Sequence, residues 1–390
     1  RQVDGRAAGG AGNAHEWHRD SGGAALGKTV AHPLVVRRRG SEGANRHAVR
    51  NALMLLAGTE DGVYRVEGVR DGRETEVRRV LAADRVFRIR RFDALDGLFV
   101  AAQSGLYHSL DGDDWERIPV PEDEVYAVAA GPAGDRLYVG TRPARLFVAD
   151  AGSVPPSDAS AWEAVAGFDA LRDRCDWGLA RHDGVAQVRS LRTHPTAPDR
   201  LVAGVEVGGV HVSDDGGATW TTRGIEGFDA PHTDDVHHLA GDAETMVAST
   251  GSGLYRTTDV GRTWRRLDGD HRQRYFKEAF VHESRVYAGG APAHPATWDE
   301  GDDHALFVSR GGRTLERASS PATGELPLGW CRAGDDVVTA THRGTLLRRR
   351  RGDGGPGGGD DAAGGGDWER LASLPTLRSR GYLPTCWFEP

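Results

Sequence analysis

An eight-residue turn sequence occurs at residues 213–220 and again at residues 257–264, and it constrains the fold of this chain more than any other feature. Both copies follow the pattern S/T-x-D-x-G-x-T-W, with fixed positions Ser213, Asp215, Gly217, Thr219 and Trp220, and Thr257, Asp259, Gly261, Thr263 and Trp264. The hydroxyl and the carboxylate can hydrogen-bond the backbone of a tight turn, glycine tolerates a positive φ, and tryptophan supplies an apolar anchor. The pattern therefore predicts a turn between two antiparallel strands.

Weaker versions of the same turn extend the pattern along the chain. Residues 109–115 lack one position, and residues 309–315 have lost both the aspartate and the tryptophan. Between these turns, apolar and polar residues alternate with the period of two that is typical of β-strands, and no long segment has a helical period. The chain is therefore expected to be nearly all β.

The two complete turns resemble the Asp box, also called the BNR repeat, of sialidase-like β-propellers. The resemblance covers roughly residues 54–390 and extends to WD40/YVTN/BNR-like repeats and to proteins likened to photosystem II assembly factors. It implies a propeller in which the box connects the third and fourth strands of a blade, on the face opposite the ligand site. It implies an architecture and no particular activity.

The repeat predicts seven four-stranded blades. Inner strands are expected to begin near residues 86, 125, 185, 236, 277, 329 and 383. Six blades are the alternative, because the third unit is irregular. The first unit begins at Met54 without an inner strand, and residues 383–388 would supply that strand by pairing with residues 55–59. Such a pairing would close the ring with strands from both ends and protect the sheet edges.

Composition divides the chain into an N-terminal extension and one large domain. Residues 1–53 are rich in Gly, Ala, Arg and His without any period, so they are expected to be a disordered or artefactual extension before Met54. Residues 54–390 are expected to form a single propeller domain. Within it, the Gly/Asp-rich composition of residues 351–367 predicts a mobile loop.

The propeller domain is acidic. The chain has 49 Lys/Arg and 57 Asp/Glu residues, of which nine basic and four acidic ones lie in residues 1–53, leaving 40 basic and 53 acidic residues for the domain. Such a balance argues against nucleic-acid binding and is typical of salt-adapted, halophile-like proteins. There is no long apolar segment or signal-peptide pattern, and the three cysteines lack metal-ligand spacing, so we expect a cytoplasmic protein without a membrane partner.

Polar and aromatic residues gather in the long loops expected on the ligand face, around the fourth to sixth units. Together with arginines that alternate along inner strands, they suggest a set of ligand-binding residues: Arg88, Arg189, Arg192, Glu206, His237, Arg274, Tyr275 and Lys277. The planar fork of arginine suits carboxylates, phosphates and sugar acids. The alternative is that the arginines pair with Glu206, Asp235 or Glu278 and tie the blades together.

Arg88 is a candidate for a second reason. The sequence Phe87-Arg88-Ile89-Arg90 is similar to the Phe-Arg-Ile-Pro motif of sialidases, with arginine in place of proline. The resemblance implies that Arg88 binds a carboxylate.

A small group of His and Asp residues precedes the fifth inner strand. His232, Asp234 and His237 carry the nitrogen and oxygen ligands that zinc, manganese and iron accept. The alternative is that His237 hydrogen-bonds a neighbouring blade while the aspartates cap the turn. We expect no cofactor, with a divalent metal as the alternative.

The sequence favours a non-catalytic cytoplasmic propeller that binds a small anionic ligand or a protein segment on its loop-rich face. One alternative is a sialidase-like glycoside hydrolase, which needs two carboxyls across one pocket; the available acids are Asp176, Asp183, Glu206 and Asp234. The other alternative is a metal-dependent, lactonase-like hydrolase, which needs several ligands converging on the central channel.

Overall fold

The computed structural model describes residues 54–69, 75–152, 155–175, 177, 184–298, 301, 303–310, 312–350, 368–375 and 381–389. These residues belong to one compact unit, Arg50–Pro390. The predicted N-terminal extension (residues 1–53) and the predicted mobile loop (residues 351–367) lie outside the described residues. No helix in the described part of the chain is long and apolar enough to cross a membrane.

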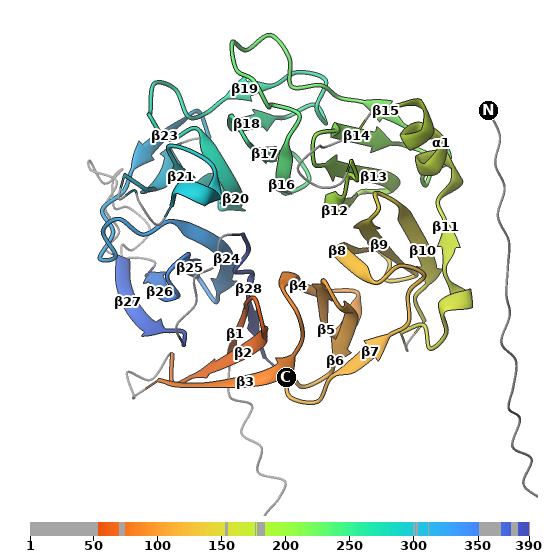
Figure 1. The fold of residues 1–390 in the computed structure, drawn as a ribbon, viewed down its shortest axis with the longest axis horizontal. Coiled ribbons are helices and arrows are strands. Elements are labelled where there is room, and N and C mark those ends of the chain that lie inside the picture. Colours follow the sequence, from red (N-terminus) through yellow and green to blue (C-terminus); the bar gives the residue numbers. More distant parts are fainter. Residues whose placement is uncertain are drawn as a thin grey trace, which may run out of the picture. The chain divides into compact units, whose positions relative to one another are not determined.

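Seven four-stranded antiparallel sheets are arranged in a ring (Figure 1), and each sheet is one propeller blade. Blade 1 contains β28 (Thr385–Phe388), β1 (Met54–Gly58), β2 (Gly62–Glu67) and β3 (Glu76–Ala82), and blade 2 contains β4 (Val86–Phe92), β5 (Leu95–Ala102), β6 (Gly105–Ser109) and β7 (Glu116–Ile118). Blade 3 contains β8 (Glu124–Ala130), β9 (Arg136–Arg142), β10 (Leu146–Asp150) and β11 (Glu163–Ala164), and blade 4 contains β12 (Val188–His194), β13 (Ala197–Val205), β14 (Gly209–Ser213) and β15 (Thr221–Thr222). Blade 5 contains β16 (Val236–Gly241), β17 (Met246–Thr250), β18 (Gly253–Thr257) and β19 (Arg265–Arg266). Blade 6 contains β20 (Tyr275–His282), β21 (Arg285–Ala291), β22 (Ala305–Arg310) and β23 (Thr314–Arg317). Blade 7 contains β24 (Pro327–Ala333), β25 (Asp336–Thr341), β26 (Thr345–Arg349) and β27 (Trp368–Ser373).

The ring is closed by strands from the two ends of the domain. Strand β28 is antiparallel to β1, with Met54 opposite Phe388 and Ala57 opposite Thr385. Because β28 is the inner strand that blade 1 otherwise lacks, the predictions of seven blades and of this closure are confirmed, and six blades is wrong.

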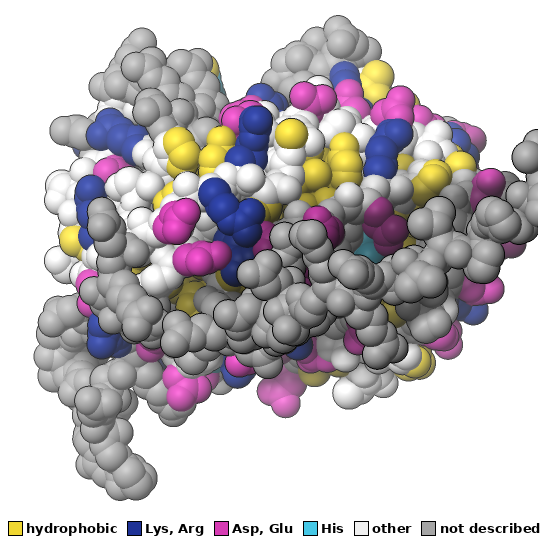
Figure 2. All heavy atoms as spheres, turned by 90° about the horizontal axis from the view of Figure 1, so that it is seen from below, with side chains coloured by type: hydrophobic (Ala, Val, Ile, Leu, Met, Phe, Trp, Pro, Cys, Tyr) yellow, Lys and Arg dark blue, Asp and Glu magenta, His cyan; other side chains and the backbone are white. Residues whose placement is uncertain are grey.

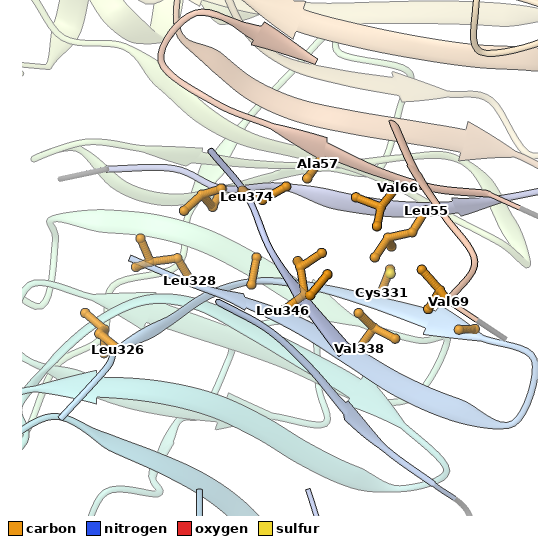
Figure 3. Close-up of a cluster of buried hydrophobic side chains, with 14 of the residues drawn as sticks. Leu55, Ala57, Val66, Val69, Leu326, Leu328, Cys331, Val338, Leu346 and Leu374 are labelled. Carbon is orange, nitrogen blue, oxygen red and sulfur yellow. The ribbon is translucent and has the colours of Figure 1, made fainter. Parts of the chain in front are cut away.

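Apolar side chains fill the interfaces between adjacent blades. Figure 3 shows one such cluster, in which Leu55 and Val66 of blade 1 pack with Cys331, Val338 and Leu346 of blade 7. Each blade therefore buries both faces of its sheet, and the ring is stabilised by a series of small cores between neighbouring blades.

One element departs from the nearly all-β prediction. The sequence predicts no helical segment, but α1 (Ala166–Arg174) is a nine-residue helix. The helix buries Phe168 and Leu171, which are one turn apart, and the Phe168 ring lies 5.1 Å from the ring of Trp220. Short 3-10 turns also occur at η1 (Ala159–Ala161) and η3 (Pro295–Thr297).

The two repeated turn sequences connect antiparallel strands, as predicted: β14 pairs with β15, and β18 pairs with β19. In the first turn, the Ser213 hydroxyl donates to Asp215 at 2.8 Å and accepts from the Gly217 amide at 2.8 Å. Both the amide and the hydroxyl of Thr219 donate to the Asp215 carboxylate, at 2.8 and 2.6 Å. The second turn repeats these bonds around Asp259. One carboxylate thus organises each turn.

Replacing Asp215 with alanine should lower the melting temperature slightly at neutral pH, because three donors lose their acceptor. The hydrogen bonds from the Thr219 side chain, the Thr219 amide and the Ser213 side chain lower the pKa of Asp215 from 3.8 to about 2. A carboxyl whose pKa falls on folding contributes stability that is present above its unfolded-state pKa and is lost as the pH falls through the folded-state pKa. The deficit of Asp215→Ala should therefore disappear near pH 2 in circular dichroism melts. The matched variant Asp229→Ala removes an exposed carboxylate and should melt like the wild type; an Asp215 deficit that is independent of pH would contradict this account.

Candidate binding site in the central channel

Extra residues in the inner strands determine which side chains point into the central channel. In blades 2 to 7 the pairing between the first and second strands skips a position near the start of the inner strand; the residues concerned are Phe87, Tyr126, Arg189, His237, Lys277 with Glu278, and Leu328. A β-bulge of this kind interrupts the regular alternation and re-aims a side chain. The bulges therefore bring several polar residues of different blades towards one another.

The polar bulge residues Arg189, His237, Lys277 and Glu278 lie with buried polar residues from other positions in what we call the buried polar cluster: Arg88, Arg189, Glu206, Asp235, His237, Lys277, Glu278 and Tyr382. Arg88 is only 2% exposed. Its Nη1 donates to Oε1 of Glu278 at 2.8 Å and to the carbonyl of Phe87 at 2.7 Å. Its Nη2 donates to the carbonyls of Arg189 at 2.9 Å and His237 at 3.2 Å. A single guanidinium thus joins blades 2, 4, 5 and 6.

Arg189 has a separate carboxylate partner. Its Nε and Nη2 bind the two oxygens of Glu206 at 2.9 and 2.5 Å, and its Nη1 donates to the Tyr382 hydroxyl. The Gln187 amide also donates to Glu206. Burial would raise the pKa of Glu206, but the charge of Arg189 outweighs it, so the pKa is lowered and the pair is ionised.

His237 binds the next blade, as one of the two sequence interpretations proposed. Its Nδ1 donates to the carbonyl of Phe276 at 2.6 Å, and its Nε2 lies 3.4 Å from Oδ2 of Asp235. The Lys277 ammonium lies 5.4 Å from the ring centre of Tyr275 and 5.5 Å from that of Tyr382. Burial, and then the nearby Lys277 charge, lower the pKa of His237, which favours the neutral imidazole.

The channel also contains a pocket of about 280 Å³, which we call the channel pocket. It is lined by residues of six inner strands, those of blades 2 to 7, among them Arg90, Phe92, Leu191, Arg192, His238, Glu278, Phe280, Val281 and Trp330. Phe92, Arg192 and Phe280 are half-buried, so the pocket reaches solvent.

The channel pocket lies towards the face that carries the repeated turns. Thr193, which lines the pocket, pairs with Leu201, and Leu201 pairs with Ser213, the first residue of one repeated turn. The resemblance to Asp-box propellers instead implied a ligand site on the opposite face. Several residues of the loops that the sequence predicts for that face lie outside the described residues.

The channel pocket holds two guanidiniums with no carboxylate partner among the described residues. Arg90 approaches the Nε2 of His238 at 3.3 Å and the carbonyl of Ile89 at 3.4 Å. Arg192 donates to the carbonyl of Gly241 at 2.6 Å. His238, whose Nε2 faces Arg90, is only slightly exposed. These contacts leave the positive charge of both arginines uncompensated by a direct ion pair.

Electrostatic effects in the channel pocket follow from this excess of positive charge. Burial, and then the charge of Arg88, lower the pKa of Arg90 to about 10, and Arg192 acts in the same direction. Burial lowers the pKa of Arg192 too, partly offset by Asp242. The pKa of His238 falls well below its ordinary value because of burial and then of the surrounding arginines. At neutral pH the pocket therefore presents two cations and a neutral imidazole.

The remaining predicted residues are not brought to the channel pocket. Arg274 forms an ion pair with Asp268 at 2.6 Å in the loop before β20. His232 and Asp234 are exposed, whereas His237 is fully buried. The structure does not bring the proposed metal ligands together, and no group of three potential metal ligands occurs in the part of the chain that the structure describes.

The predicted carboxylates are also separated. Glu206 is bound to Arg189, and Asp234 is exposed on its loop. Asp176 and Asp183 lie outside the described residues. Of the described residues that line the channel pocket, Glu278 is the one carboxylate, and it is bound to Arg88.

Elsewhere the surface charges are mixed. Acidic and basic side chains are interspersed over the coloured surface in Figure 2. Several of them form ion pairs, such as Arg65 with Asp113 at 2.5 Å and Arg85 with Glu60 at 2.6 Å. The two arginines of the channel pocket differ from these arginines in having no carboxylate partner among the described residues.

Comparison with known proteins identifies the fold. Neither a protein-family model nor a curated protein matches the sequence. Among solved structures, the chain is similar to the GH74 xyloglucanase from Xanthomonas campestris, with a TM-score of 0.56 and 17% identity over 76% of this chain and 50% of that one. It is also similar to a GH74 enzyme from Niastella koreensis, with a TM-score of 0.50 and 14% identity over 73% of this chain and 45% of that one.

A third likeness, to YCF48 bound to a D1 peptide, has a TM-score of 0.48 and 14% identity over 73% of this chain and 81% of that one. This chain spans half the length of the xyloglucanase and less than half the length of the Niastella enzyme. At these identities the likeness shows the fold alone. The chain is a seven-bladed β-propeller similar in fold to the propellers of GH74 enzymes.

Proposed function

We propose that the protein is a non-catalytic binding propeller whose channel pocket holds an anionic group. The observation that supports this proposal is the pair of guanidiniums, Arg90 and Arg192, that share the pocket without a carboxylate partner among the described residues. A charge removed from water without a partner is unfavourable, and an acidic chain has many carboxylates that could have supplied one. An anion from outside would compensate both charges.

The chemistry of the pocket favours binding over hydrolysis. Hydrolysis of a glycoside requires two carboxyls across one pocket, one of them free to move a proton. The described lining offers Glu278 alone, and Arg88 holds that carboxylate at 2.8 Å. His238 accepts from Arg90 through Nε2, and burial and then the surrounding arginines lower its pKa, which favours the neutral imidazole.

The proposal predicts that inorganic phosphate stabilises the wild-type protein at neutral pH and constant ionic strength. A ligand that binds only the folded state stabilises it by about 2.7 kcal/mol when its concentration is 100 times Kd. The double variant Arg90→Gln/Arg192→Gln should lose this stabilisation. Without phosphate the double variant should melt above the wild type, because its glutamines remove the repulsion between two partly buried cations.

The control is Arg91→Gln, which removes an exposed guanidinium from the same strand as Arg90. It should keep the full response to phosphate. Equal stabilisation of the double variant and the control, measured by differential scanning calorimetry, would contradict anion binding in the channel pocket.

A further inference from the structure

The channel pocket has an apolar half as well as a cationic half. Arg90, Arg192 and His238 come from blades 2, 4 and 5. Phe280 and Val281 come from blade 6, and Trp330 comes from blade 7. The two arginines thus come from blades 2 and 4, whereas Phe280 and Trp330 come from blades 6 and 7, and Phe92 of blade 2 is an additional ring in the lining.

The aromatic half is supported from behind by other rings. Trp330 is 6% exposed, and its ring lies 6.2 Å from that of Tyr287 and 6.1 Å from that of Trp368. The Phe280 ring lies 6.4 Å from that of Tyr287. Ring pairs at these separations pack favourably, so the apolar wall is preformed. Such a wall would stay in contact with water if the ligand were an inorganic anion.

A single buried donor adds to the apolar half. The indole nitrogen of Trp330 is buried and has no hydrogen-bond partner among the described residues. Buried indole N–H groups usually have an acceptor, because leaving one unpaired is unfavourable. The pocket therefore combines two cations, a flat apolar wall and one unsatisfied donor within the same small space.

The volume of the pocket limits the size of its ligand. A pocket of about 280 Å³ is slightly smaller than the sites that hold drug-sized ligands. It has room for roughly ten non-hydrogen atoms if each takes the volume of about 30 Å³ that one water molecule occupies. One aromatic ring with a short acidic substituent is of this size.

We propose that the channel pocket binds a small monocyclic aryl carboxylate, with its carboxylate between Arg90 and Arg192 and its ring against Phe280 and Trp330. This inference rests on the anion-binding function proposed above and adds the apolar body of the ligand. An aspartate or glutamate side chain of a partner protein would occupy the cationic half and leave the aromatic wall empty. Inorganic anions would do the same.

The test is isothermal titration calorimetry of the full chain at neutral pH with three probes: phenylacetate, acetate and phenylacetamide. Phenylacetate should bind with a stoichiometry of one and about 10 to 100 times more tightly than acetate, because its ring is removed from water. Phenylacetamide should not bind, because it has the ring but no charge. Arg90→Gln should abolish binding of both anions.

Two variants separate the ring from the charge. Phe280→Ala should lower the affinity for phenylacetate towards that for acetate and leave the affinity for acetate unchanged. Phe280→Leu should lower the affinity for phenylacetate by a smaller factor. Leu110→Ala removes an apolar side chain that is 65% exposed outside the channel pocket and should change neither affinity.

Each outcome decides between the two proposals. Equal affinities for acetate and phenylacetate, or a Phe280→Ala variant that binds phenylacetate like the wild type, would overturn the aryl carboxylate and leave anion binding in place. A short acidic peptide, titrated as a further probe, would overturn it as well if the peptide bound and phenylacetate did not. If phosphate, acetate and phenylacetate all fail to bind, both the inference and the proposed function are wrong.

Discussion

Replacing Arg88 with methionine should destabilise the folded protein by about 3–5 kcal/mol, which is the usual effect of removing one partner from a buried ion pair. Arg88 is 2% exposed, and its loss leaves the carboxylate of Glu278 buried in the channel without its partner at 2.8 Å. Three carbonyls, of Phe87, Arg189 and His237, also lose a donor. The effect should be measured by urea denaturation, with a lowered midpoint and an unchanged m-value.

The destabilisation should depend on pH in a defined direction. Burial raises the pKa of Glu278, and the positive charge of Arg88 opposes that rise. Without Arg88 the pKa of Glu278 should rise further. A carboxyl whose pKa is raised on folding destabilises the folded state above its folded-state pKa, and this destabilisation is lost as the pH falls and the carboxyl becomes protonated. The deficit of Arg88→Met relative to the wild type should therefore shrink as the pH is lowered and Glu278 becomes protonated.

Two variants make this prediction specific to the buried pair. Arg91→Met removes an exposed arginine from the same strand and should change stability little. Arg88→Met/Glu278→Gln removes both charges and should recover part of the loss. If Arg88→Met were no more destabilising than Arg91→Met, the buried polar cluster would not hold the blades together.

Removing residues 382–390 should prevent the domain from folding into a stable monomer. The truncation deletes β28, the inner strand of blade 1, and with it the buried side chains of Tyr382, Leu383, Cys386 and Phe388. Burial of one large apolar side chain contributes about 1.5–3 kcal/mol, so the loss is comparable to the whole stability of a typical domain, about 5–15 kcal/mol. It also exposes the edge of β1 to other chains.

The expected observations are a loss of the cooperative thermal transition in circular dichroism and aggregates in size-exclusion chromatography. A control that lacks only residues 389–390 keeps the entire strand and should behave like the wild type. A truncated chain that remains monomeric and melts cooperatively near the wild-type temperature would show that the closure contributes little.

Most of the fold could be predicted because its signals are local. The repeated turn depends on residues at most seven positions apart, such as Ser213 and Trp220, and every one of its predicted partners is close in the sequence. The ring closure could also be predicted, because a single strand was missing at residue 54 and a single strand was left over near residue 385. Helix α1 was missed because Phe168 and Leu171 are its only buried side chains, too few to reveal a helical period.

The candidate site was less predictable because it depends on contacts between distant blades. Alternation predicts Arg88 and Arg90 on one side of their strand, but it could not show that Arg88 reaches Glu278 while Arg90 has no carboxylate partner among the described residues. A β-bulge adds one residue and interrupts the alternation of side chains, so the position of Arg189 could not be derived from the period alone. The role of Trp330 depends on blades 7 and 2 lining one pocket, which only the closed ring determines.

The central claim is that Arg90 and Arg192 form an anion site in the channel, and a crystal soaked in sodium bromide tests it most directly. Bromide is an anion whose position can be located by anomalous scattering without any assumption about the natural ligand. The account predicts an anomalous peak in the channel pocket, in contact with both guanidiniums, that is absent from the Arg90→Gln/Arg192→Gln variant. Bromide at surface arginines with none in the pocket, or a pocket peak that persists in the double variant, would contradict it.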